Sequence, residues 1–137
     1  MTYLTRATAT AGALLAAAGL LAAGPAQAAP RDTLRGNRLV LTVTKGDARS
    51  GGTRGAVLLC DPPLGHAHAA EACAELAAAG GAIDRLPSRS VFCPMIYAPV
   101  TAYARGRWNG RSVEFQQTYS SECVLHARTG SVFALDS

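Results

Sequence analysis

The stretch VFCPMIYAP, residues 91–99, combines large apolar side chains with tight conformational constraints. The ring of Pro94 fixes its own φ angle and disfavours helical geometry at Cys93, which is pushed into an extended conformation. A second proline ends the stretch, and Met95 and the β-branched Ile96 lie between these constraints. A rigid, extended loop of this kind suits a protease cleft, because its backbone can add to the enzyme as a strand while alternate side chains fill pockets.

The chain contains four cysteines, and this even number predicts a disulfide framework if the protein is exported. Four cysteines allow three pairings, which the spacing alone leaves open. A zinc site is the competing interpretation, but the sequence contains no C-x-x-C pair and an exported protein favours oxidation. We therefore expect no metal and no cofactor. The four residues are Cys60, Cys73, Cys93 and Cys123.

Histidine side chains can serve as metal ligands or catalytic bases, and the chain has three. His66, His68 and His126 have no acidic residue at a matching spacing, so they are predicted to be solvated surface residues. The sequence also lacks a G-x-S-x-G motif, in which a strained turn presents a nucleophilic serine. These observations predict that the protein is not an enzyme.

The N-terminal segment Met1–Ala28 is typical of a secretory signal peptide. Arg6 supplies the positive charge, Ala11–Ala23 is an uncharged apolar run, and the AQA sequence at 26–28 fits a cleavage site. The apolar run is shorter than the roughly 20 residues that a spanning helix needs, which disfavours the alternative of a retained membrane anchor. We expect cleavage after Ala28, an extracellular protein and no membrane partner after cleavage. Residues 29–137 then form a single domain, with residues 29–38 as a flexible arm.

The charge distribution argues against nucleic-acid binding. The chain has 13 Lys and Arg against nine Asp and Glu, for a formal net charge of +4. The basic residues are scattered, with no basic helix and no interleaved aromatic side chains. A nucleic-acid interface would gather them on one element.

Runs of β-branched and apolar residues bounded by turn residues predict a sheet. The DPP sequence at 61–63 is expected to end one strand, because proline cannot donate to a ladder. The Asn109-Gly110 pair predicts a hairpin turn, and Gly46–Gly55 a turn-rich connection. The predicted strands are Leu39–Val43, Ala56–Cys60, Val100–Arg105, Arg111–Tyr119 and Ser131–Leu135.

Helical spacing of apolar residues predicts one main helix over His66–Gly80. Its buried face comprises Ala72, Cys73, Leu76 and Ala77, and glycines at 80 and 81 end it. A short helix with a serine cap is predicted over Ser120–Leu125, and Arg85–Pro99 is predicted to be an extended surface loop. The sum is an α+β fold: an antiparallel sheet of about five strands with one main and one short helix.

Six motifs, taken in this order, resemble the Streptomyces subtilisin inhibitor family. The resemblance covers roughly residues 39 to 133, and no single motif is specific alone. The motifs are Leu39–Val43 followed by Lys45-Gly46; Ala72–Ala78 with Gly80-Gly81; Cys93–Tyr97 with Pro99-Val100; Trp108 with Gly110; Ser121–Cys123; and Gly130–Phe133.

The resemblance implies a secreted serine protease inhibitor with the disulfides Cys60–Cys73 and Cys93–Cys123. It also implies that Met95–Ile96 is the scissile bond offered to a subtilisin-like serine endopeptidase, and that the protein is a homodimer joined sheet to sheet. Met95 then occupies the P1 position, the residue that enters the primary specificity pocket. The expected protease-binding loop consists of Phe92, Cys93, Pro94, Met95, Ile96 and Tyr97.

Two residues near the expected loop differ from the family pattern. Ser121 stands where an asparagine is common, whose side chain is expected to support the loop by hydrogen bonding. Ala98 stands where an aspartate is commoner. Neither position changes the P1 assignment.

A second hypothesis is a secreted regulator or substrate of an extracellular transglutaminase on the same fold. Such a protein would use Gln116, Gln117 or Lys45. An inhibitor needs Met95–Ile96 exposed and anchored by a disulfide, whereas a regulator needs accessible Gln or Lys side chains. For Phe92 the sequence leaves two possibilities open: a second apolar anchor in the protease-binding loop, or a side chain packed inward.

Overall fold

The computed structural model describes residues 36–46 and 52–136, so the predicted signal peptide lies outside the described residues. Their central feature is an antiparallel five-stranded sheet with the order β3-β2-β1-β4-β5. Two α-helices and one short 3₁₀ helix accompany it. The elements are β1 (Arg38–Lys45), β2 (Thr53–Cys60), β3 (Pro63–Leu64), α2 (Ala69–Ala78), η1 (Ile83–Arg85), β4 (Val100–Trp108), β5 (Arg111–Tyr119) and α3 (Glu122–Thr129).

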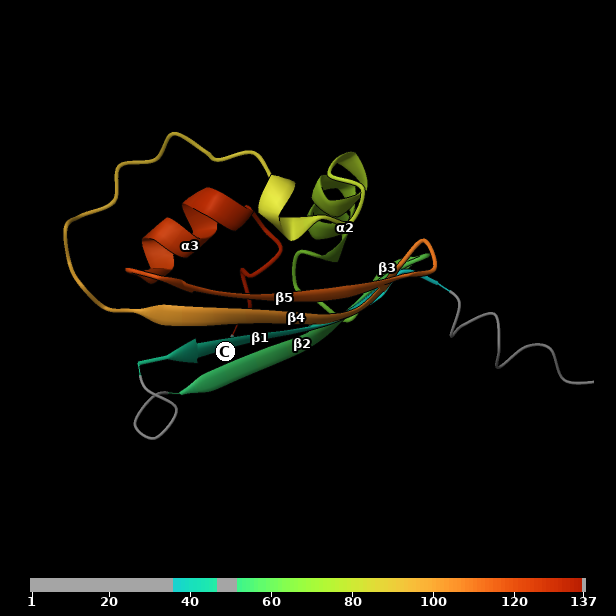
Figure 1. Cartoon of the computed structure of the whole chain (residues 1–137), viewed down its shortest axis with the longest axis horizontal. Coiled ribbons are helices and arrows are strands. Elements are labelled where there is room, and N and C mark those ends of the chain that lie inside the picture. Colours follow the sequence, from blue (N-terminus) through green and yellow to red (C-terminus); the bar gives the residue numbers. More distant parts are fainter. Residues whose placement is uncertain (1–35, 47–51, 137) are drawn as a thin grey trace, which may run out of the picture.

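Alternation of side chains along the strands places the core on one face of the sheet. In β1, Leu39, Leu41 and Val43 are fully buried, while the residues between them are more exposed. Both α-helices cover this face, and the loop that joins η1 to β4 arches around α3 (Figure 1). The fold class predicted from the sequence is confirmed, and Asn109 and Gly110 form the hairpin turn with positive φ angles.

The predicted C-terminal strand Ser131–Leu135 is wrong. Val132, Phe133 and Leu135 are buried, but they lie in turns and irregular chain rather than in the sheet. The backbone N–H of Val132 donates to Thr129 O, and that of Ala134 to Ser131 O. An apolar segment can therefore fill the core with its side chains while its backbone bonds are satisfied locally.

The fifth strand is instead β3, inside the segment that was expected to end pairing. Pro63 pairs with Cys60 and Leu64 with Leu59 at the edge of the sheet. An edge strand tolerates proline because only one side of its backbone bonds to a neighbour. Two strands also begin earlier than predicted: β2 begins at Thr53, and β1 begins at Arg38, within the segment assigned to the arm.

The boundaries of both α-helices differ from the prediction. α2 begins at Ala69 rather than His66, and its N-cap residue His68 has non-helical backbone angles, with φ of −113° and ψ of 40°. Ala77, predicted on the buried face of α2, is exposed. α3 runs on to Thr129 and begins after its cap Ser121, whose hydroxyl accepts from the N–H of Val124. No helix among the described residues is long and apolar enough to cross a membrane.

Candidate functional site

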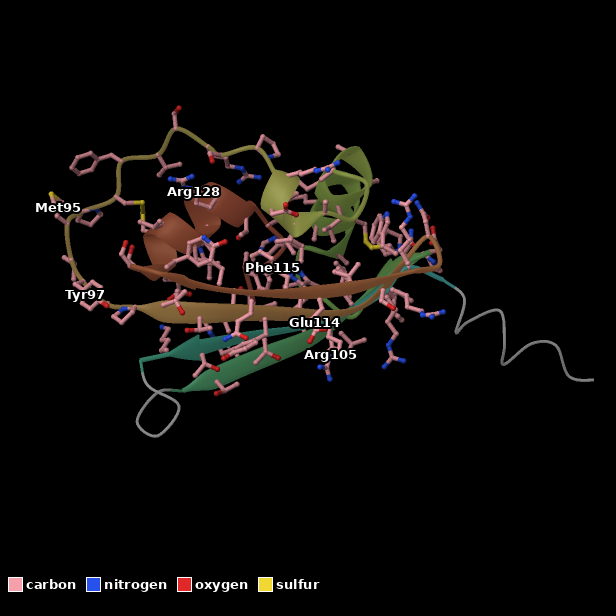
Figure 2. The ribbon with its side chains drawn as sticks, in the orientation of Figure 1. Met95, Tyr97, Arg105, Glu114, Phe115 and Arg128 are labelled. Atoms are coloured by element: carbon pink, nitrogen blue, oxygen red, sulfur yellow. A yellow bond between two sulfur atoms is a disulfide. The ribbon has the colours of Figure 1, made fainter. Side chains whose placement is uncertain are left out.

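The loop of residues 86–99 carries the most exposed apolar side chains of the described chain. Phe92 is 92% exposed, Met95 fully exposed, and Tyr97 81% exposed. Figure 2 shows Met95 at the outer end of the loop, and Tyr97 on the stretch that leads into β4. The inward-packed alternative for Phe92 is therefore wrong. Apolar side chains gathered at a protruding loop indicate a surface that binds another molecule.

The backbone turns sharply at Met95. The N–H of Ile96 donates to the carbonyl oxygen of Pro94 at 2.8 Å, so Met95 is the central residue of a three-residue turn. The sequence predicted an extended loop here, and the loop has no helix or strand, but it bends at Met95 and again before Val91, whose N–H donates to Arg89 O at 3.0 Å. The bend directs the Met95 side chain outward and places the peptide bond Met95–Ile96 at the tip.

The limb that follows Met95, residues 96–99, is held by two backbone hydrogen bonds. The N–H of Ala98 donates to Ser120 O at 2.9 Å, and the N–H of Gly46 donates to Pro99 O at 3.0 Å. Directly afterwards Val100, which is 2% exposed, enters β4. This limb is therefore fixed to the sheet within three residues of the tip.

The limb that precedes Met95, residues 86–93, is held at three points. Leu86 packs into the core at one end. The N–H of Arg89 donates to Ala127 O in α3 at 2.7 Å. At the other end, Cys93 forms a disulfide with Cys123, with 5.7 Å between the two Cα atoms. One side of the tip is therefore tied to α3, and the other to the ends of the sheet strands.

The second disulfide, Cys60–Cys73, joins the end of β2 to α2 and lies away from the loop. Both pairings agree with those implied by the family resemblance. None of the four cysteines is free. Among the described residues, no group of His, Cys, Asp and Glu side chains could hold a metal ion.

The N-terminus of α3, which carries Cys123, is fixed to the sheet by charge pairs. Glu122 pairs with Lys45 of β1 at 3.0 Å and with Arg54 of β2. Arg54 also donates to Leu135 O at 3.0 Å. The Arg54 hydrogen bond, followed by that of Lys45, lowers the pKa of Glu122, although partial burial of the carboxylate opposes this change.

Ser121 has a different role from the asparagine that the family commonly has. Its hydroxyl caps α3 through the Val124 N–H, at 3.2 Å, and has no hydrogen bond to the loop within the described residues. The neighbouring Ser120 supports the loop instead, through its carbonyl oxygen. Sequence reasoning missed Ser120 because a backbone carbonyl leaves no trace in residue type.

The remaining candidate residues lie away from the loop tip or are already paired. His66 is not purely solvated, because its Nε2 lies 3.0 Å from Val132 O. His126 is half-buried, and its Nε2 is buried with no hydrogen-bond partner in the described residues. Gln116, on β5, donates to the hydroxyl of Tyr103 at 3.3 Å. Figure 2 shows this sheet region well separated from Met95.

The fold and the loop define a class: small, disulfide-linked α+β proteins that display a constrained apolar loop. Comparisons with known proteins place the chain within it. The profile of the family described as subtilisin inhibitor-like matches residues 35–121. The chain therefore belongs to the subtilisin inhibitor-like family.

Three relatives illustrate the similarity. A Streptomyces avermitilis protein that is provisionally named a serine protease inhibitor is 60% identical to this chain, over 90% of this chain and 84% of the relative's length. The subtilisin inhibitor of Streptomyces albogriseolus is 41% identical, over 81% of this chain and 83% of its own. In a crystal structure with Bacillus licheniformis subtilisin, Streptomyces caespitosus sermetstatin aligns with a TM-score of 0.58 at 36% identity, covering 72% of this chain and 97% of that one. These relatives are named as inhibitors and not as enzymes.

Proposed function

We propose that this protein inhibits subtilisin-like serine proteases by presenting Met95–Ile96 as a bound but slowly cleaved substrate. The observation that carries the proposal is the full exposure of Met95 at the tip of a loop that is anchored on both sides. Membership of the subtilisin inhibitor-like family supports the same activity. The sermetstatin complex supports subtilisin as the class of partner.

The side chains of the loop fit an enzyme with apolar pockets. Met95 would occupy the primary pocket as P1, whereas a trypsin-like enzyme prefers a basic residue there. Pro94 and Cys93 would then be P2 and P3, and Phe92 would be P4. Exposed, preorganised anchors of this kind contribute most of the affinity in protein interfaces, because little ordering remains to be done on binding.

Slow cleavage follows from the anchors on the two sides of the scissile bond. Attack by the enzyme's serine on the Met95 carbonyl carbon would give an acyl-enzyme and free the amino group of Ile96. Ala98 and Pro99 hold the new terminus close, and Cys93 holds the acyl side. A held amine competes with water at an effective molarity on the order of 10⁵ M or more, so the peptide bond re-forms.

We further propose that the protein is secreted after cleavage at Ala28 and forms a homodimer. The face of the sheet away from the helices supports the dimer, because Val40, Val57 and Tyr103 lie there 44%, 37% and 40% exposed. A mature protein that sediments as a monomer at micromolar concentration would contradict this part of the proposal.

The transglutaminase alternative receives less support. Gln116 and Gln117 are exposed, but both lie within β5, paired with Tyr103 and Ala102 of β4. Lys45 is paired with Glu122. The backbone of a paired strand is already hydrogen-bonded within the sheet, so this segment is poorly accessible to the active site of a modifying enzyme.

The test is a titration of subtilisin and trypsin with the oxidised mature protein and with Met95→Lys. We expect the wild type to inhibit subtilisin stoichiometrically. The variant should inhibit trypsin at least about a hundredfold better than the wild type does, because the charge it carries would pair with the acid of the trypsin pocket. Tyr97→Lys, two residues away in the same exposed loop, is the matched control. Failure of the wild type to inhibit, or rapid cleavage at Met95–Ile96, would contradict the proposal.

A further inference from the structure

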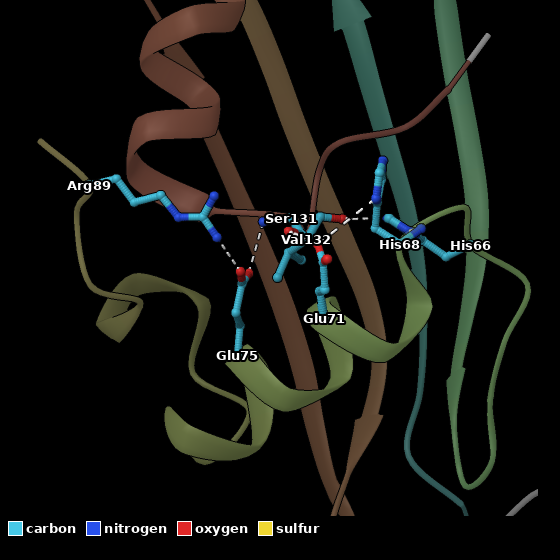
Figure 3. A network of polar contacts seen from close by, with 7 residues as sticks. All are labelled: His66, His68, Glu71, Glu75, Arg89, Ser131 and Val132. Atoms are coloured by element: carbon cyan, nitrogen blue, oxygen red, sulfur yellow. Dashed lines mark hydrogen bonds and ion pairs between the residues drawn. The ribbon is translucent and has the colours of Figure 1, made fainter. Parts of the chain in front are cut away.

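The limb that precedes Met95 contains a charged contact that the proposed function does not use. Arg89 Nη2 lies 2.5 Å from Glu75 Oε1 on α2, in addition to the backbone bond from Arg89 to Ala127 (Figure 3). Phe92 and Met95 follow Arg89 by three and six positions. Arg89 therefore joins the loop to both helices.

The carboxylate of Glu75 is held in place from two sides. Its Oε2 accepts the N–H of Ser131 at 2.8 Å, while its Oε1 faces Arg89. Gly130, with φ of +58°, lies against it: a Cβ there would come within 2.4 Å of Oε2. Only glycine, which has no Cβ, allows the backbone at position 130 to lie this close to the Glu75 carboxylate, so the chain after α3 packs directly against it.

The surroundings of Glu75 make a rigid anchor rather than a free surface charge. On the preceding turn of α2, Glu71 accepts a hydrogen bond from the Ser131 hydroxyl at 3.0 Å, and His66 reaches Val132 O (Figure 3). α2 itself is joined to β2 through Cys73. The Glu75 side chain is 22% exposed, compared with 56% for Arg89.

Arg89 is the attachment point of an otherwise free segment. Between Leu86, in the core, and Cys93, in the disulfide, the only N–H groups of the described loop that donate to the rest of the protein are those of Arg89. The carbonyl oxygen of Phe92 lies 3.9 Å from Cys123 Sγ, whose sulfur is in the disulfide and has no proton to donate. Phe92 is almost fully exposed, so no core contact fixes its place. Its position depends on the backbone on either side of it.

We propose that the Glu75–Arg89 pair is a positioning device for Phe92, the P4 residue; this inference rests on the proposed function. Neither residue of the pair needs to touch the protease. By fixing the backbone at Arg89, the pair shortens the free segment before Cys93 and holds Phe92 where a second apolar pocket of the enzyme can receive it. The pair therefore acts on affinity through Phe92 rather than through Met95.

The first part of the test compares inhibition constants for subtilisin. Arg89→Ala and Glu75→Gln should each weaken inhibition about two- to fivefold, the range of a partly exposed ion pair. Glu75→Gln keeps an oxygen for the Ser131 N–H and removes only the charge. Arg89→Lys should restore most of the affinity. Arg85→Ala is the control, since it removes an exposed arginine of η1 that makes no ion pair within the described residues and does not lie on the proposed dimer face.

The decisive readout is a double-mutant cycle with Phe92→Ala. In the wild type we expect this truncation to weaken inhibition about tenfold. In the Arg89→Ala background it should cost clearly less, because Phe92 is no longer held in place. Equal losses in both backgrounds would overturn the proposal. So would a loss in Arg89→Ala with none in Glu75→Gln, since Arg89 would then contact the protease itself.

Amide hydrogen exchange in the free protein separates this inference from the proposed function. Exchange at the N–H of residue 89, which donates to Ala127 O, and at that of Val91, which donates to the carbonyl oxygen of residue 89, should be faster in Arg89→Ala and Glu75→Gln than in Arg85→Ala, beyond what any change in unfolding free energy explains. If the wild type does not inhibit, the proposed function fails, yet the exchange experiment still decides whether the pair holds the limb. Unchanged exchange at both residues would overturn the positioning role.

Discussion

The two disulfides occupy different kinds of surroundings. Cys60 ends β2 and Cys73 lies in the middle of α2, with its side chain in the core, so regular structure holds both ends. Cys93 lies in an irregular, exposed loop, and only its partner Cys123 belongs to a helix. The two bridges close segments with sequence separations of 13 and 30 residues.

Chain entropy alone would rank the two bridges as nearly equal. Loop-closure entropy in the unfolded chain gives a stabilisation of about 3 kcal/mol for the shorter closed segment and slightly more for the longer one. This entropy argument assumes that the native state stays unchanged when the bridge is removed. That assumption fits Cys60–Cys73, but a loop freed at Cys93 gains conformational freedom in the native state too, which offsets part of the loss. The first bridge therefore stabilises the fold, and the second mainly controls the loop.

The largest expected effect is on stability, from the core bridge. The double variant Cys60→Ala/Cys73→Ala should lose about 3 kcal/mol of unfolding free energy, measured by denaturant titration. Below its melting transition it should still inhibit subtilisin within a fewfold of the wild type, because the loop keeps its anchors. A variant that remained stable but lost inhibition would reverse the roles assigned to the two bridges.

The loop bridge should show the opposite pattern. In Cys93→Ala/Cys123→Ala we expect a smaller loss of unfolding free energy, but at least about a hundredfold faster hydrolysis of Met95–Ile96 by subtilisin. Without the bridge, the acyl carbon of Met95 is no longer held beside the amine of Ile96, so that amine competes poorly with water. Small displacements of reacting groups cost roughly this factor in rate. Mass spectrometry of the complex over time measures the cleavage. Equal cleavage in the two double variants would contradict the comparison.

The smallest expected effect concerns Glu122, which precedes Cys123 and fixes α3 to the sheet. Because hydrogen bonds from Arg54 and then Lys45 lower its folded pKa, its stabilisation is fully present above the unfolded pKa of about 4.3. It is lost as the pH falls through the lower, folded pKa. Glu122→Gln should therefore cost on the order of 1 kcal/mol at neutral pH and much less in acid.

Unfolding titrations of both proteins from about pH 7 down to about pH 2 measure this difference. The Met95–Ile96 bond should be cleaved at nearly the wild-type rate in Glu122→Gln at neutral pH, since the disulfide remains. A variant cleaved as fast as the one without the loop bridge would assign Glu122 to the control of the loop. Glu114→Gln, in an exposed pair on the sheet, is the matched control and should show little pH-dependent difference.

The sequence by itself determined the features that arise from local physical rules. Runs of β-branched and apolar residues indicated β1, β4 and β5, with shorter bounds for β1 and β4 than the structure has. The Asn109-Gly110 pair set the hairpin, because only a few residue types accept positive φ. Pro94, Pro99 and Cys93 indicated a constrained surface loop. The resemblance to a family supplied the pairing of the cysteines.

Only the tertiary structure decided the features that depend on partners distant in the chain. The buried residues Val132 and Phe133 looked like a strand, since apolar character records burial and not whether the backbone pairs in a sheet. Pro63 entered the sheet because its strand lies at the edge. The Glu75–Arg89 contact could not be found from the sequence, since it joins a helix to an irregular loop and no periodicity connects the two positions.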